Sequence, residues 1–164
     1  MRKRNARIDS ILFAKYVLNR AFDKDIEVGP TKFQRILYAI DIDLLINDIN
    51  LIDENCRAFE YGPVYPEVLL YFKHRDERIC NGKFDSYNRK YKENFSSIKK
   101  DKRIKSINES IDYILDKCKD FTTGELVSWS MEEGAPWSMV YDPKEPRKIE
   151  KTLMKRYYSQ FIIE

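Results

Sequence analysis

Apolar residues recur at helical spacing along most of this chain, and that spacing limits the fold more than any other feature. The clearest stripe runs from 104 to 118, with members three and four residues apart: Ile104, Ile107, Ile111, Ile114, Leu115 and Cys118. A stripe of this kind predicts a helix that buries one face in a core. The same reasoning predicts a first helix from about Asp9 to Phe22 and a last helix from about Ile149, which presents Leu153, Met154, Tyr157 and Phe161.

Capping residues predict where two more helices begin. Thr31 and Gln34 fit a capping box, in which the two side chains satisfy exposed backbone donors reciprocally, ahead of a second apolar stripe. Thr122 and Glu125 fit another, ahead of a short helix that ends at residues 134–136.

Prolines constrain the segment Tyr61-Gly62-Pro63-Val64-Tyr65-Pro66, which cannot be helical throughout. Pro63 pushes Gly62 towards extended geometry, and Pro66 suits the first turn of a new helix. A short extended piece is predicted just before this turn, from Cys56 to Phe59.

A basic insert interrupts the helical pattern from about 82 to 105. Nine cations face three carboxylates there: Lys83, Arg89, Lys90, Lys92, Lys99, Lys100, Lys102, Arg103 and Lys105 against Asp85, Glu93 and Asp101. Its apolar residues follow no long period, which predicts an irregular or hairpin-like excursion with some mobility.

The length and composition favour one domain over the whole chain, 1–164. Hydrophobic residues make up 43% of the 164, enough for one core, and no Gly/Ser linker or internal repeat divides the sequence. We therefore expect a mainly helical, single compact domain with a short β-hairpin or extended insert in its middle.

The cysteine content indicates the compartment. Cys56, Cys80 and Cys118 form an odd, widely spaced set, which favours reduced thiols over a disulfide framework. No apolar run approaches the roughly 20 residues needed to cross a bilayer. We expect a cytoplasmic protein with no membrane partner.

The chain carries no recognisable catalytic apparatus. His74 is the only histidine, and it lies between Lys73 and Arg75, where a polar helix surface is the simpler reading. The glycine-rich phosphate loops and the nucleophile elbow are absent. We expect no cofactor, no metal and no enzymatic activity, and instead a protein that binds another macromolecule.

The basic insert leaves a nucleic-acid partner open as an alternative. Tyr87, Tyr91 and Phe95 stand among its cations, so charge for phosphate and rings for base stacking occur together. A Lys-rich loop anchored by its aromatic residues and a surface for an acidic protein explain the same residues. Because the net charge is only +3, we expect only weak, salt-dependent nucleic-acid binding.

Three stretches together resemble the Panacea antitoxin domain, a family that includes GepA-like phage-associated proteins and SocA-type antitoxins. They are residues 30–38 (PTKFQRILY), 59–68 (FEYGPVYPEV) and 126–137, which ends in Gly134-Ala135-Pro136-Trp137, and the likeness extends over roughly 9 to 161. One departure concerns the Thr-His pair that the family commonly has ahead of Pro-Trp. This chain has Ser130-Met131 there, so no role of that histidine carries over.

The resemblance implies a mainly helical antitoxin that neutralises a protein toxin, encoded nearby, by direct contact, in some members by delivering it to a cellular protease. The motifs supply candidate partner-binding residues: Lys32, Gln34, Tyr61, Gly62, Pro63, Val64, Pro66, Glu67 and Trp137. Lys32, Gln34 and Glu67 are favoured among them because their polar ends need water or a partner, although Gln34 also fits the capping box.

Overall fold

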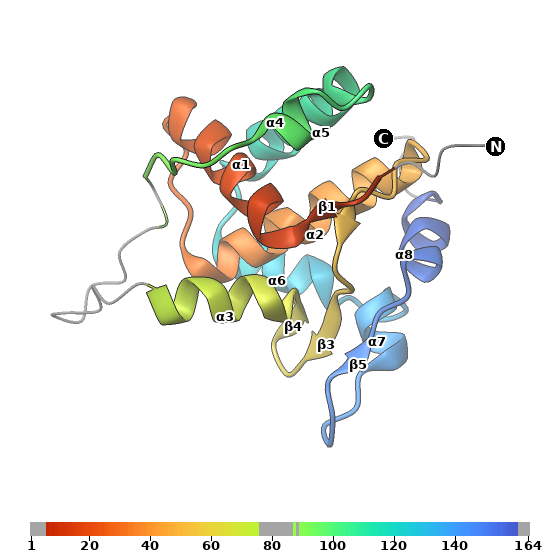
Figure 1. Ribbon diagram of the computed structural model, residues 1–164. Helices are drawn as coiled ribbons and strands as arrows, with labels where there is room; N and C mark the ends of the chain where they lie inside the picture. Colours follow the sequence, from red (N-terminus) through yellow and green to blue (C-terminus); the bar gives the residue numbers. More distant parts are fainter. Residues whose placement is uncertain (1–5, 76–86, 88, 161–164) are drawn as a thin grey trace, which may run out of the picture.

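The computed structural model describes residues 6–75, 87 and 89–160, and helices dominate this part of the chain (Figure 1). Eight helices lie within the described residues: α1 Ser10–Asp23, α2 Pro30–Ile46, α3 Pro66–Arg75, α4 Ser96–Lys99, α5 Ile104–Cys118, α6 Thr123–Ser130, α7 Pro136–Val140 and α8 Lys151–Tyr158. The strands are short: β1 Ile8–Asp9, β2 Ile52–Asp53, β3 Arg57–Phe59, β4 Gly62–Val64 and β5 Arg147–Lys148. The mainly helical fold predicted from the sequence is confirmed.

Two small sheets join distant parts of the chain. β1 pairs in parallel with β2, which places Ile8 opposite Ile52. β3 is the central strand of an antiparallel sheet in the order β4-β3-β5, with Ala58 opposite both Pro63 and Arg147. The predicted extended piece at 56–59 is therefore one arm of a tight hairpin.

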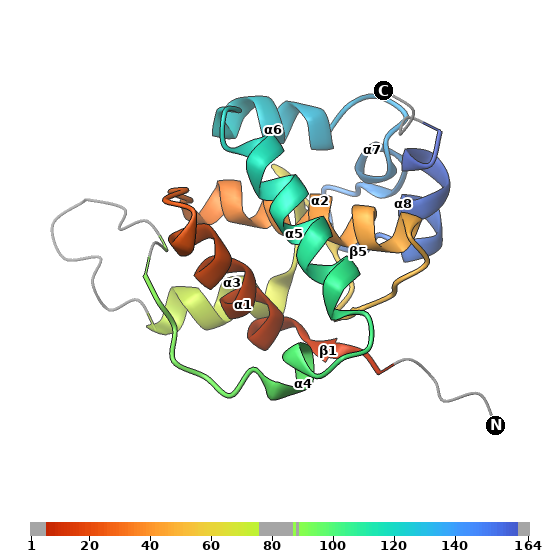
Figure 2. The same ribbon diagram turned by 90° about the horizontal axis from the view of Figure 1, so that it is seen from above.

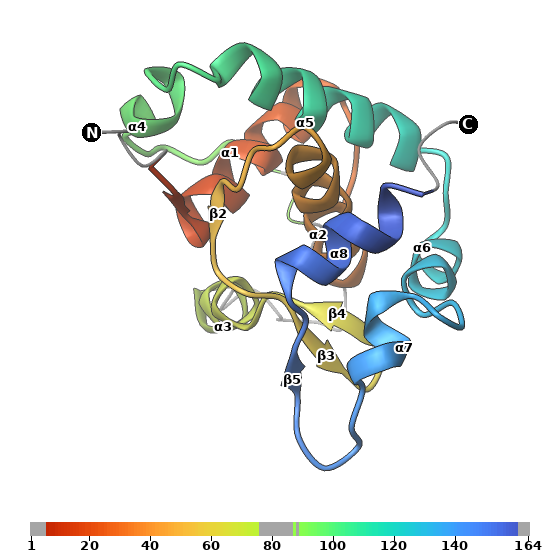
Figure 3. The same cartoon turned by 90° about the vertical axis from the view of Figure 1, so that its right-hand side faces the viewer.

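α2 is the central helix, and the other elements surround it (Figures 2 and 3). It contacts α5, α6, α8 and β4, and twelve of its seventeen residues are buried. A helix buried on nearly all sides normally lacks polar residues. α2 nevertheless buries Gln34, Arg35 and Asp41, which must find partners inside the protein.

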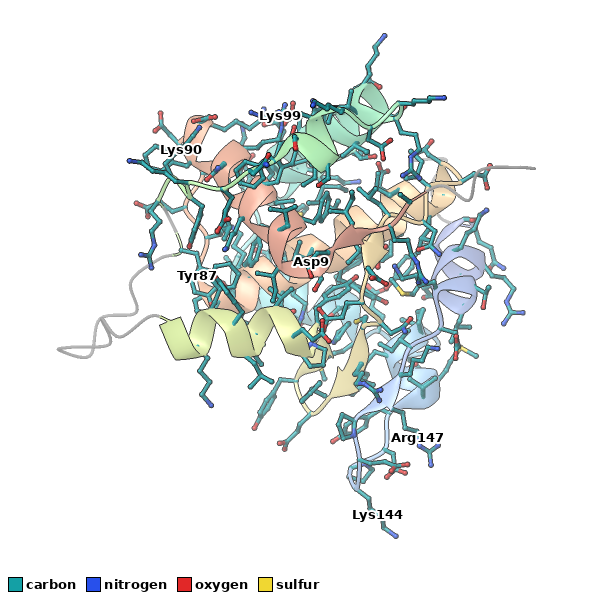
Figure 4. All side chains as sticks on the ribbon, in the orientation of Figure 1. Asp9, Tyr87, Lys90, Lys99, Lys144 and Arg147 are labelled. Carbon is teal, nitrogen blue, oxygen red and sulfur yellow. The ribbon has the colours of Figure 1, made fainter. Side chains whose placement is uncertain are left out.

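Helix starts follow the sequence predictions in two cases and depart from them in one. Asp9, which is labelled in Figure 4, caps α1 by accepting from the Leu12 N–H at 2.9 Å, and Thr122 and Glu125 form the predicted capping box of α6. The capping box predicted at Thr31 and Gln34 is wrong. α2 begins two residues earlier than that cap requires, with Gly29 as its N-cap and Pro30 as its first residue, and Gln34 turns into the core.

The described part of the basic insert is held to the core by its apolar residues. Tyr87, Phe95 and Ile98 are buried, and Tyr87 stacks on Phe72 of α3 with ring centroids 5.0 Å apart. Figure 4 shows Lys90 and Lys99 at the periphery, on an irregular segment and on α4. The predicted excursion over 82–86 lies outside the described residues.

The buried apolar residues form one cluster. Phe33, Leu37, Ile111 and Leu115 belong to it, and Trp129 packs against it, as their helical spacing predicted. The main stripes of α2 and α5 therefore face each other across a shared core.

A buried ion pair ties α8 to α2. Asp41 is fully buried, and its carboxylate accepts from the Tyr65 hydroxyl at 2.7 Å and lies 3.5 Å from the ammonium of Lys151. Lys151 also donates to the carbonyl of Ile52 at 2.7 Å. Burial raises the pKa of the Asp41 carboxyl, and the charge of Lys151 opposes that rise.

Truncation of either facing helix should destabilise the fold. Leu37→Ala and Ile111→Ala should each lower the free energy of unfolding by about 2 to 5 kcal/mol, since both side chains are at most 2% exposed and leave cavities. Urea unfolding followed by circular dichroism measures this. A loss within about 0.5 kcal/mol, typical of surface positions, would show that these faces do not form the core.

Removal of the lysine of the buried pair should make stability depend on pH. Lys151→Met should cost about 3 kcal/mol at neutral pH, because it leaves the buried Asp41 carboxylate without a counter-charge. Burial already raises the folded-state pKa of this carboxyl above its unfolded value of about 4, and removal of Lys151 raises it further. The stability loss relative to the wild type should therefore grow as pH rises above the wild-type folded-state pKa and be smallest near pH 4 and below. Unfolding curves across this range, with Asp41→Asn/Lys151→Met as the control, check it. Equal pH dependence in both variants would contradict the assignment.

Candidate partner-binding surfaces

The motif turn at 61–66 is held by a buried arginine of α2. Arg35 is 2% exposed, and its guanidinium donates to the carbonyl oxygens of Tyr61 and Pro63. Burial lowers the pKa of Arg35, because water no longer solvates its charge. Carbonyl dipoles take the place of that water, so the charge fixes the hairpin against α2.

Gln34 completes the contact between α2 and the turn. Its side-chain oxygen accepts from the Tyr65 N–H at 2.8 Å, and its amide nitrogen lies 3.5 Å from the Tyr65 carbonyl. The Tyr65 hydroxyl donates to the carboxylate of Asp41, about two turns further along α2. The motifs at residues 30–38 and 59–68 are thus in direct contact with each other.

Gly62 is the point of closest approach in this contact. Its φ is +124°, a backbone conformation that residues with a side chain rarely adopt, and a Cβ there would lie 2.5 Å from Nη2 of Arg35. The position needs glycine both for backbone geometry and for space.

Lys32 and Glu67, two favoured candidates, lie at helix ends. The ammonium of Lys32 donates to the carbonyl of Phe121 at 2.7 Å, just beyond the end of α5, and lies 3.4 Å from that of Lys119. The Glu67 N–H, in the first turn of α3, donates to the carboxylate of Glu54 at 2.6 Å, while the Glu67 side chain is exposed. Lys32 therefore already has partners, and the Glu67 carboxylate faces solvent.

The remaining candidates differ widely in exposure. Trp137 donates its indole N–H to the Phe59 carbonyl at 2.7 Å and stacks on Tyr141. Gly62 and Pro63 are buried, Val64 and Pro66 are half-buried, and Tyr61 is 71% exposed. Tyr61 and Glu67 are thus the most accessible of the nine, and partner contact by any of them stays a prediction.

A second surface escaped the sequence reasoning: an apolar groove of about 930 Å³ lined by α2, α5, α6, α8 and the turn between α5 and α6. Figure 3 shows these helices grouped around the central α2. Tyr113 and Phe121, on its walls, are 54% and 40% exposed. Trp129 and Tyr158 lie deeper, and their rings pack against each other with centroids 5.4 Å apart.

The groove carries fixed negative charge. Asp43 accepts from the Ser110 hydroxyl, Glu125 accepts from the Thr122 N–H within the capping box, and Glu132 lies on the rim. None of these three carboxylates has an ion-pair partner among the described residues. Lys117 is the one cation of the lining, and it lies 5.6 Å from the centre of the Tyr113 ring.

Lys32 is a motif residue that contacts a wall of the groove. Its hydrogen bond to Phe121 holds the turn between α5 and α6, which forms one wall of the groove. The adjacent Cys118 also lines the groove, and burial raises the pKa of its thiol. Lys32, a motif residue, therefore stabilises a groove wall that lies about ninety residues away in the sequence.

Neither a metal-binding cluster nor a membrane-spanning helix is found in the described part of the chain. Within residues 6–75, 87 and 89–160, no three His, Cys, Asp or Glu side chains are grouped so that they could hold a metal ion. No helix among these residues is long and apolar enough to cross a membrane. Cys80 and the His74 side chain lie outside the described residues.

Comparison with known proteins identifies the family. Searches of curated proteins and of solved structures gave no significant match. The family model described as antitoxin SocA-like, Panacea domain, matches residues 33–138, a narrower span than the sequence resemblance suggested but well over half of the chain. This span contains the Arg35 contact, the hairpin turn, α5 and α6, and most of the groove lining. The chain belongs to the SocA-like Panacea antitoxin family.

Proposed function

We propose that this protein is an antitoxin that neutralises a protein toxin by direct binding, and that the toxin occupies the groove between α2, α5, α6 and α8. The observation that carries the proposal is an apolar groove with exposed aromatic walls on a member of an antitoxin family. Neutralisation then needs no chemistry by the antitoxin, because a toxin held in the groove is sequestered.

The groove suits a protein interface in composition. Tyr113, Phe121 and Trp129 supply rigid aromatic surface, the kind of residue that contributes most to binding energy in protein complexes. A contiguous exposed apolar surface also favours aggregation unless a partner covers it.

The motif turn is a weaker interface candidate than its sequence suggests. Gln34, Arg35 and Gly62 are occupied in holding the hairpin against α2, so they cannot face a partner while that contact is intact. Tyr61 and Glu67 remain accessible, so the exposed side of this turn, the turn surface, is a second candidate.

Two further roles are proposed from the family resemblance and from the basic insert. Delivery of the bound toxin to a cellular protease would add degradation to sequestration, and an immunoblot of the toxin in the rescued cells would detect it as loss of toxin. Nucleic-acid binding through the basic insert remains the alternative, but no contact favours it. Tyr87 and Phe95 pack in the core, so these two rings are not at the surface where bases stack.

Filling the groove should abolish neutralisation without unfolding the protein. Ser128 is exposed on α6 and lines the groove, so Ser128→Trp should block toxin binding and cost about 0.5 kcal/mol or less in stability. Ser97→Trp, at an exposed position on α4 outside the groove, is the matched control. Growth is measured in cells that co-express each variant with the neighbouring gene product that is toxic alone, together with co-purification and thermal midpoint. If Ser128→Trp rescues growth as well as Ser97→Trp, the groove is not the interface.

The turn surface is tested separately. Tyr61→Ala/Glu67→Ala should fold normally and still rescue growth, because both side chains are exposed and neither lines the groove. Lys32→Ala should cost about 1 kcal/mol and weaken rescue, since it frees the turn that carries Phe121. Thermal midpoint and rescue are compared in the same variants. Loss of rescue in the double variant at an unchanged midpoint would move the interface to the turn.

A further inference from the structure

We propose that the groove recognises an amphipathic helix of the toxin that carries Lys or Arg beside an apolar stripe. This inference rests on the proposed function, and it specifies the chemistry of the segment that the groove accepts. The argument uses the shape of the groove, the sign of its charge and the way its carboxylates are held.

The shape favours a helix over an extended strand. The lining residues come from α2, α5, α6 and α8 and from the turns after α5 and α6, and none comes from a strand. The groove therefore offers no row of unpaired backbone groups to which a strand could be added. Grooves between helices bind amphipathic helices through apolar residues spaced three, four and seven apart.

The charge of the groove opposes that of the whole molecule. Its lining contains Asp43, Glu125 and Glu132 against Lys117, a balance of three negative charges and one positive, or −2. The full chain carries +3. A partner drawn to the groove by its charge would thus be cationic, although the net charge of the chain is positive.

Two of these carboxylates are already oriented. The Ser110 hydroxyl holds Asp43, and the Thr122 N–H holds Glu125 at 3.2 Å. Each retains an oxygen for a further donor, so a Lys or Arg can pair with it at little cost in side-chain freedom. Glu132, on the rim after α6, adds a third acceptor.

Other occupants of the groove would give different binding results. A small apolar molecule would bind regardless of flanking charge. The chain's own residues 161–164 (FIIE) follow closely on Tyr158, which lines the groove, but they include Glu164, whose charge the carboxylates disfavour. These alternatives are outcomes of the experiment below.

The test uses two labelled synthetic peptides of 18 residues that share one helical leucine stripe and differ only in their flanks, which carry Lys in one and Glu in the other. Fluorescence anisotropy measures their affinity for the full chain. The Lys peptide should bind at least about tenfold more tightly than the Glu peptide, as expected from a few partly exposed ion pairs. Ser128→Trp should remove binding of both, and Ser97→Trp should change neither.

Charge variants separate the groove from the general surface. Asp43→Asn/Glu125→Gln/Glu132→Gln keeps the hydrogen-bond acceptors and removes the charges, so it should abolish the tenfold preference. Glu27→Gln/Glu60→Gln/Glu109→Gln, at exposed positions outside the groove, should retain it.

Each contrary result has a distinct meaning. Equal binding of the two peptides by the wild type, or loss of the preference in the control triple variant, would overturn the inference. Peptide binding that appears only after deletion of residues 161–164 would also overturn the inference, because it would mean that these residues occupy the groove in the intact chain. If Ser128→Trp still loses rescue of growth in these cases, the proposed function stands without the inference. Normal rescue by Ser128→Trp would instead remove the groove from the proposed function.

Discussion

The buried guanidinium of Arg35 is the contact on which the arrangement of this protein depends. It joins the central helix to the hairpin turn through the carbonyls of Tyr61 and Pro63, and it leaves room only for glycine at position 62. The hairpin in turn sets the start of α3 and aligns β3 with β5, which leads into α8. One buried charge thus organises elements from both halves of the chain, and its desolvation is offset only while the turn keeps its shape.

The elements of the fold could be predicted largely from local sequence, but the roles of the polar motif residues could not. The apolar stripe of α5, the start of α3 at Pro66 and the capping box at Thr122 depend on neighbours in the chain, and all three are found where predicted. The spacing of Gln34 from Thr31 predicts that it is part of a cap. A partner thirty-one residues away, Tyr65, takes it instead, and no local pattern reports such a contact.

The groove was missed for the same reason. Ile114, Leu126 and Trp129 belong to helical stripes that read equally well as core or as a binding face. Only the packing of four helices shows that this apolar surface is left partly open. Most of the family motif residues lie at the hairpin turn and its contact with α2, where they mainly stabilise the fold. Lys32 is the exception, because it stabilises a wall of the groove from a motif position.

Hydrogen exchange of the antitoxin, alone and in complex with its toxin, tests the central claim most directly. Binding in the groove should slow amide exchange in α6 and in the segment from Tyr113 to Phe121, while the hairpin from Arg57 to Val64 exchanges as in the free protein. Protection confined to the hairpin and the start of α3, with α6 unchanged, would contradict the account and place the toxin on the motif turn.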